Sequence, residues 1–257
     1  MLRIWRLQCA PAEVRVGLVF LWVLIVSAWL APREPSDAAR IQAVALQVLI
    51  VAGTPLLFAR LAGFRLKPLF KLRPVSPYQA GFAILLGLCL VPWLEAVHYY
   101  QGQLGGETAQ LQQRVQSWLQ GSHPAWILLT MALVPAVCEE LLFRGFVFNQ
   151  LLGPETRARA VLVSAVLFGI FHRHLLLILP AGLAGILFAV MVQRSRSLAP
   201  AILAHFTVNA CAVALSNWQA AASVSWLTGK GPVPAAVLAA SGIGLIVFGG
   251  LLRNRQD

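Results

Sequence analysis

Apolar residues occur along this chain in blocks of about 20, separated by short segments that carry basic residues, proline or glycine. A helix needs about 20 consecutive apolar residues to cross the hydrocarbon core of a bilayer, so each block predicts a membrane-spanning helix. The predicted spans are residues 14–31, 41–59, 79–98, 126–152, 158–172, 178–193, 198–216 and 233–252. We expect an all-α fold, a polytopic membrane helix bundle with about eight transmembrane helices in one integral membrane domain.

Composition and charge placement agree with a membrane protein. The chain is 59% hydrophobic with a mean hydropathy of +0.75, and only 11% of its residues are charged. Its net charge of +11 is concentrated in the connections. When successive connections are assigned to opposite sides, fourteen of the 20 Lys and Arg residues fall on one side and five on the other. This bias predicts a multi-pass protein of the cell membrane with both termini cytoplasmic and contacts with anionic lipid, and it argues against nucleic acid as a partner.

The sequence also predicts the local structure of two further segments. The Gln-rich segment 108–120, in the longest connection, predicts a short surface helix that either caps the outer end of the bundle or simply connects two spans. Residues 158–193 provide only 36 residues for two crossings. We therefore expect a short hairpin whose tip dips into the membrane, which would let water and a substrate reach the site from the outer side. An opening toward the cytoplasm is the alternative.

Two carboxylates and a guanidinium lie inside the predicted span 126–152. Such groups cost several kcal/mol at mid-membrane unless they are paired or face a polar cavity, so they indicate a functional site. Glu140 and Arg144 are four residues apart, which places them on one helix face in an order that favours an ion pair. Glu139 is rotated by about 100° from Glu140 and can point elsewhere. One carboxylate is therefore expected to be available for chemistry.

Two later spans carry polar residues with the same spacing of four. Phe168 and His172 share a face of the span 158–172, and His205 and Asn209 share a face of the span 198–216. At 1.5 Å per residue, the polar groups of the three spans lie about 16 to 21 Å from the basic side. They can therefore form one polar layer between helices.

The set Glu139, His172, His205 and Asn209 is chemically sufficient for hydrolysis. A carboxylate or a neutral imidazole can take a proton from water, while a second imidazole and a carboxamide can donate hydrogen bonds to an oxyanion. No aspartate and no serine with a plausible base lies in the spans, so the attacking group is expected to be water. Each pair alone could also be a structural contact between helices. Their shared depth favours catalysis.

The motifs Glu139-Glu140-x-x-x-Arg144, Phe168-x-x-x-His172 and His205-x-x-x-Asn209 occur in this order on separate predicted helices. In these motifs the chain resembles the CPBP intramembrane proteases, also called the Abi family or type II CAAX prenyl endopeptidases, which include bacteriocin-processing relatives. On this basis residues 126–216 form a CPBP-like catalytic core. Residues 1–125 provide N-terminal membrane helices and the outer connecting segment, and residues 217–257 provide a C-terminal membrane helix.

The resemblance implies an endopeptidase whose site is a cavity between helices and whose substrate is a membrane-associated protein or peptide. The implied roles are water activation by Glu139 with His172, an oxyanion pocket from His205 and Asn209, a pair of Glu140 with Arg144, and pocket shaping by Phe168. Whether that substrate is prenylated is left open.

A metal is neither required nor excluded by these residues. Glu139, His172 and His205 could form a three-ligand zinc site with an open position, but the chain contains no His-Glu-x-x-His helix, and a metal-free glutamate mechanism is equally compatible. Two other functions use similar residues. A non-catalytic immunity or scaffold protein could keep the fold, and a proton-coupled transporter would also place Glu and His at mid-membrane, although it would usually show internal repeats.

Overall fold

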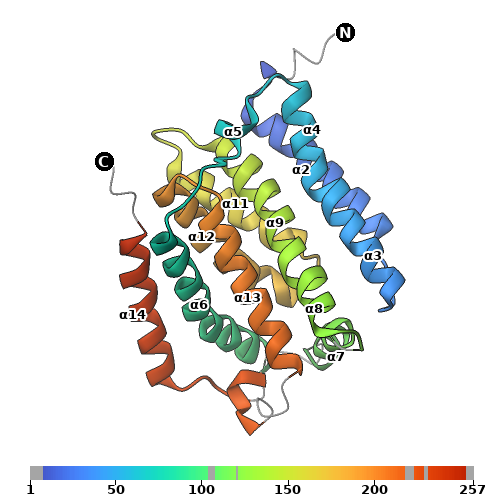
Figure 1. Cartoon of the computed structure of the whole chain (residues 1–257), viewed down its shortest axis with the longest axis vertical. Helices are drawn as coiled ribbons and strands as arrows, with labels where there is room; N and C mark the ends of the chain where they lie inside the picture. The colour runs from blue at the N-terminus through green and yellow to red at the C-terminus, as the bar shows by residue number, and fades with distance from the viewer. Residues whose placement is uncertain (1–7, 104–107, 120, 218–222, 229–230, 253–257) are drawn as a thin grey trace.

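The computed structural model describes residues 8–103, 108–119, 121–217, 223–228 and 231–252. Within these ranges the chain forms helices and no strands, as the pattern of apolar blocks in the sequence predicts (Figure 1). Two of the long helices contain π-helical turns. The first consists of α3 (Asp37–Leu46), η1 (Gln47–Ala52) and α4 (Gly53–Leu61). The second consists of α8 (Pro124–Ile127), η2 (Leu128–Leu133), α9 (Val134–Glu140), η3 (Leu141–Val147) and α10 (Phe148–Leu151).

The other long helices are single segments. They are α2 (Ala12–Leu30), α6 (Pro77–Gln103), α11 (Arg157–Phe171), α12 (Leu175–Ser195), α13 (Ala199–Asn217) and α14 (Ala235–Leu251). Three short helices complete the described chain: α5 (Leu66–Leu69), α7 (Thr108–Leu119) and η5 (Ser225–Thr228). Each of the eight predicted spans coincides with one long helix, so the polytopic all-α bundle is confirmed.

Not every long helix is long enough to cross a bilayer. Among the described residues six helices have the necessary length and hydropathy, namely α2, the helix 37–61, α6, the helix 124–151, α12 and α13. The 17 residues of α14 are apolar but shorter. The 15 residues of α11 extend about 22 Å, less than the roughly 30 Å of a hydrocarbon core. The count of eight crossings therefore stays a prediction, and a hairpin tip within the membrane is compatible with the short α11.

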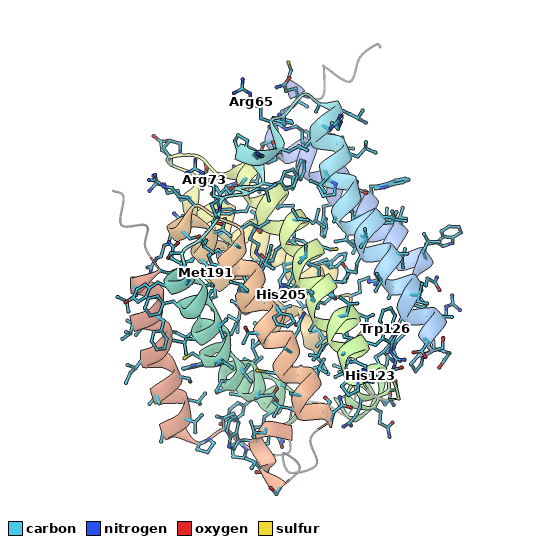
Figure 2. The ribbon with its side chains drawn as sticks, viewed as in Figure 1. Arg65, Arg73, His123, Trp126, Met191 and His205 are labelled. Atoms are coloured by element: carbon cyan, nitrogen blue, oxygen red, sulfur yellow. The ribbon has the colours of Figure 1, made fainter. Side chains whose placement is uncertain are left out.

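The two ends of the bundle differ in charge. Helix α2 begins and α14 ends toward the same end (Figure 1). Arg65 and Arg73 lie at this end, His123 and Trp126 lie toward the opposite end, and His205 lies between them (Figure 2). This arrangement agrees with the alternating assignment of the connections. That the basic end faces the cytoplasm is still a prediction.

The outer surface of the bundle is apolar. On α2, Leu18, Trp22 and Ile25 are exposed, and on α14, Ile243 and Ile246 are exposed. Exposed apolar faces of this kind are costly in water and favourable in contact with lipid chains. The side chains therefore support a multi-pass membrane protein.

Two glycines allow helices of the candidate site to pack closely. A Cβ atom added at Gly169 on α11 would lie 2.5 Å from the carbonyl oxygen of Ile178 on α12. A Cβ atom added at Gly87 on α6 would lie 2.8 Å from the carbonyl oxygen of Ala204 on α13. Small residues at such crossings let two backbones approach each other. These crossings place α11 and α13, the helices that carry both candidate imidazoles.

Gly169→Ala is therefore expected to lower the free energy of unfolding by about 1–3 kcal/mol, because the new methyl group meets backbone that cannot rotate away. The measurement is the thermal unfolding midpoint of the purified protein in detergent. Gly81→Ala is the control, because an added Cβ atom there has nothing within 4 Å. Equal midpoints for the two variants would contradict the close α11–α12 crossing.

Candidate functional site

The predicted pair of Glu140 and Arg144 is present and completely buried. Arg144 Nη1 donates a hydrogen bond of 2.8 Å to Glu140 Oε1, and both side chains are 0% exposed. Arg144 also donates to the carbonyl oxygen of Gly185 on α12 at 2.9 Å, and its guanidinium lies 4.3 Å from the ring centroid of Phe168 on α11. A single buried cation thus connects three helices, which explains how the apolar bundle accommodates it.

Glu140 has a second partner that its local spacing did not indicate. His205 Nδ1 on α13 lies 3.0 Å from the same Glu140 Oε1 atom that accepts from Arg144. Because a carboxylate only accepts hydrogen bonds, Nδ1 is the protonated ring nitrogen. The other nitrogen, Nε2, lies 4.0 Å from Glu139 Oε2. Glu140 therefore orients the imidazole in addition to neutralising Arg144.

Glu139 is buried and not paired with Arg144, as the helical rotation predicted, but it has a partner of its own. Gln47 Nε2 donates a hydrogen bond of 3.0 Å to Glu139 Oε1. Gln47 is the first residue of the π-helical segment η1, which packs against α9. It matches none of the motifs; its only signal was an amide within the apolar span 41–59. π-Helical turns often occur at functional sites.

Gln47→Leu is expected to lower kcat about tenfold and to leave KM within about twofold, because a hydrogen bond to a charged group contributes about 1.5 kcal/mol or more. The measurement is peptide hydrolysis by the protein in liposomes. Gln42→Leu serves as the control, since the exposed Gln42 donates only to the carbonyl oxygen of Leu30. A rate for Gln47→Leu equal to that of the control would show that the hydrogen bond does not position Glu139 for the reaction.

His172 caps the end of α11 and is oriented by its own helix. Its Nδ1 atom lies 2.9 Å from the carbonyl oxygen of Phe168, so Nδ1 carries a proton and Nε2 can accept one. The Phe168 ring contacts His172 edge-on at 4.9 Å and His205 edge-on at 5.6 Å between centroids. Phe168 thus separates the two imidazoles and supports both, in agreement with a pocket-shaping position.

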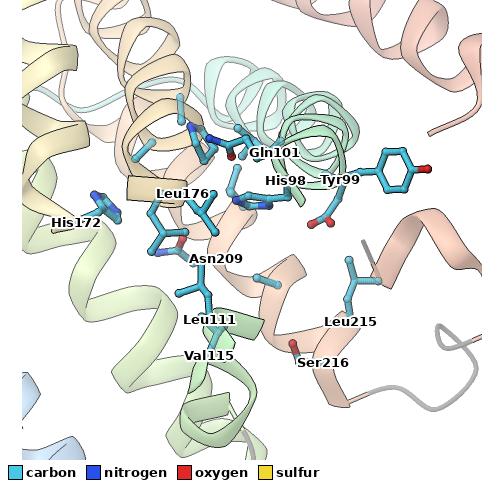
Figure 3. Close-up of a pocket in the computed structure, with 18 of the residues that line it drawn as sticks. His98, Tyr99, Gln101, Leu111, Val115, His172, Leu176, Asn209, Leu215 and Ser216 are labelled. Atoms are coloured by element: carbon cyan, nitrogen blue, oxygen red, sulfur yellow. The ribbon is translucent and has the colours of Figure 1, made fainter. Parts of the chain in front are cut away.

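A cavity of about 700 Å³ adjoins this cluster (Figure 3). His172, His205, Asn209 and Phe168 line it, so three of the four polar residues expected to act together share one cavity. Glu139 does not line this cavity and approaches it only through His205. The set of residues expected to act together is therefore divided between a buried carboxylate cluster and a cavity wall, with His205 in both.

Helix α7 forms part of the same cavity. Leu111, Val115 and Leu119 contribute to its wall. The predicted Gln-rich helix therefore forms and lies over the cavity rather than acting as a plain connector. Residue 120 of the predicted segment lies outside the described residues.

The sequence motifs did not indicate the polar residues on the α6 wall of the cavity, which include Glu95, His98 and Gln101. Glu95 and His98 fall inside the predicted span 79–98. A charged side chain within that apolar run was the signal that could have identified them.

The candidate zinc ligands do not gather into a metal site. In the described part of the chain, no three His, Cys, Asp or Glu side chains are arranged to hold a metal ion. Glu139 and His205 approach each other, but each already has a hydrogen-bond partner, and His172 is directed by the backbone of α11. The residues therefore do not fit a three-ligand zinc centre, and the steps described below use protein side chains and water.

Residues 121–211 match the family model for type II CAAX prenyl endopeptidase, Rce1-like. The matched segment covers less than half of the chain and contains all three motifs. It supports the CPBP/CAAX protease family and confirms the resemblance seen in the sequence. No curated protein and no solved structure matches the chain.

Proposed function

We propose, from the endopeptidase family that residues 121–211 match, that this protein is an intramembrane endopeptidase that hydrolyses a peptide bond in a membrane-associated protein or peptide. The observation that carries the proposal is the position of His205. Its ring joins the buried carboxylates Glu139 and Glu140 and also lines the cavity. The carbonyl group of a substrate in the cavity would therefore lie next to the His205 ring, which in turn lies next to the buried carboxylate of Glu139.

Glu139 is the proposed general base. It takes a proton from a water molecule held near Glu139 Oε2 and His205 Nε2, whose separation of 4.0 Å is too long for a direct hydrogen bond but can be bridged by water. The water oxygen forms a bond to the peptide carbonyl carbon. The carbonyl π electrons move to the oxygen, which becomes an oxyanion. As the C–N bond breaks, the departing nitrogen takes the proton that Glu139 received.

His205 and Asn209 are the proposed donors to the oxyanion. With Nδ1 donating to Glu140, Nε2 of His205 faces the reacting groups, and it donates to the oxyanion in the doubly protonated imidazolium form, whose positive charge lies beside Glu139 and Glu140. Asn209 is one helical turn further along α13 and lines the same cavity, so its amide can donate from a neighbouring position. Donors held in a water-poor site stabilise developing charge more strongly than donors in water.

His172 is proposed to assist the transfer of the proton. Its Nδ1 atom is occupied by the Phe168 carbonyl oxygen, which leaves Nε2 free to accept a proton within the cavity.

The test is mass spectrometry of new peptide termini in membrane fractions from cells that carry the intact protein or Glu139→Gln at matched abundance. Termini that disappear with Glu139→Gln would establish proteolysis and identify the substrate. An unchanged set of termini, under conditions where the protein is needed, would contradict the proposal and favour a non-catalytic scaffold.

A further inference from the structure

We propose that Glu95, with His98 and Gln101, forms a subsite of the cavity that binds a cationic group of the substrate, namely a Lys or Arg side chain. This inference rests on the proposed function, since it concerns the peptide that occupies the cavity. The subsite lies on α6, outside the three motif helices, and it would contribute to substrate choice rather than to bond cleavage.

The three side chains line the cavity from helix α6. They are spaced by three residues along α6, so successive members lie on neighbouring positions of the helix surface. All three line the same cavity as His172 and Asn209. Figure 3 shows His98 and Gln101 across the cavity from His172, with Asn209 and Leu176 between them. A peptide in the cavity would therefore contact both walls.

The polar atoms of this wall lack protein partners. Among the described residues, His98 Nε2 and Gln101 Oε1 are buried without a hydrogen bond, and Glu95 makes no hydrogen bond or ion pair. Buried polar groups are otherwise nearly always satisfied in folded proteins. Glu139 and Glu140, by contrast, each accept from side chains at about 3 Å. The α6 wall therefore has unused bonding capacity, which Glu95 offers directly to a ligand and which His98 and Gln101 offer once their side chains rotate toward it.

The chemistry of the wall selects a cation with several N–H donors. The carboxylate of Glu95 and Oε1 of Gln101 are acceptors, and no Lys or Arg is among the described residues that line the cavity. An ammonium has three N–H donors and a guanidinium has five, whereas a neutral amide has two. A charged hydrogen bond within a largely apolar cavity is also stronger than one in water. A basic substrate side chain therefore fits this wall better than a neutral one.

The experiment measures binding and cleavage separately, with the full chain in liposomes. The probes are peptides that carry a lipid acyl group on a side chain and a single Lys, which is placed at each position in turn. Each peptide is compared with the same peptide carrying norleucine in place of Lys. Every peptide is made once with a free N-terminus and once with an acetylated N-terminus. Binding is measured in the Glu139→Gln background, where cleavage does not interfere. We expect Lys at one position to bind about tenfold more tightly than norleucine, and Glu95→Gln to reduce this preference to about twofold.

Glu155→Gln is the matched control, because it makes the same chemical change at an exposed residue outside the cavity. A Lys preference that is absent, or that persists in Glu95→Gln, would overturn the subsite even if peptides are cleaved. A preference that depends on Glu95 without any cleavage by the intact protein would support the subsite and reject the proposed protease. A preference seen only with free N-termini would assign the subsite to a terminal ammonium and overturn the Lys or Arg assignment.

Discussion

Glu139→Gln is expected to lower kcat for peptide hydrolysis by about 10² to 10⁴ and to leave KM within about twofold. An amide can still accept the hydrogen bond from Gln47, so the site keeps its shape, but it cannot hold the proton removed from water. The measurement is single-turnover cleavage of a peptide identified from the new termini, with the protein in liposomes.

Two comparisons make this result specific. Glu155→Gln should hydrolyse the same peptide at the rate of the intact protein, since Glu155 is exposed and outside the cluster. The unfolding midpoint of Glu139→Gln should stay close to that of the intact protein. Retention of more than about a tenth of the intact rate by Glu139→Gln would assign the general base to another residue.

Arg144→Met is expected to destabilise the protein by about 3–5 kcal/mol, because it leaves Glu140 as a buried carboxylate without its main counter-charge. The change also removes the bond to the carbonyl oxygen of Gly185 and the contact with the Phe168 ring. Loss of these contacts separates α12 and α11 from the helix that carries the carboxylates. The measurements are protein abundance in the membrane and the unfolding midpoint in detergent.

The double variant Glu140→Gln/Arg144→Met is the informative comparison, because removing both charges avoids an unpaired buried ion. It should be more stable than Arg144→Met alone, although inactive if His205 needs Glu140 for its orientation. Arg159→Met provides the control on an exposed pair. Arg159 bonds to Glu13 at 3.0 Å with both side chains more than half exposed, and such a pair contributes about 1 kcal/mol or less. Equal abundance of Arg144→Met and Arg159→Met would contradict a structural role of the buried pair.

The helices and the ion pair could be predicted because they depend on residues close together in the chain. Burial of about 20 successive apolar residues is a local property, so each predicted span coincides with a long helix. The four-residue spacing brings Glu140 and Arg144 together on one helix face, and the pair forms even though the π-helical segment η3 begins between them. The same reasoning correctly kept Glu139 apart from Arg144.

Contacts between helices depended on the packing of the bundle. His205 is 65 positions from Glu140, and Gln47 is 92 positions from Glu139, so no local spacing indicates either bond. The three candidate zinc ligands share a depth along their helices, yet depth does not specify rotation, and His172 is directed instead by the carbonyl oxygen of Phe168.

The sequence alone was therefore sufficient to predict a helical membrane protein, the three motif helices and the residues proposed for a hydrolytic reaction. The tertiary structure was needed to place Glu139 behind His205 and to place Glu95 on the wall of the cavity. The physical reason is that hydrophobic periodicity and helical spacing act within one helix, whereas the rotation and separation of neighbouring helices follow from side-chain packing across the whole bundle.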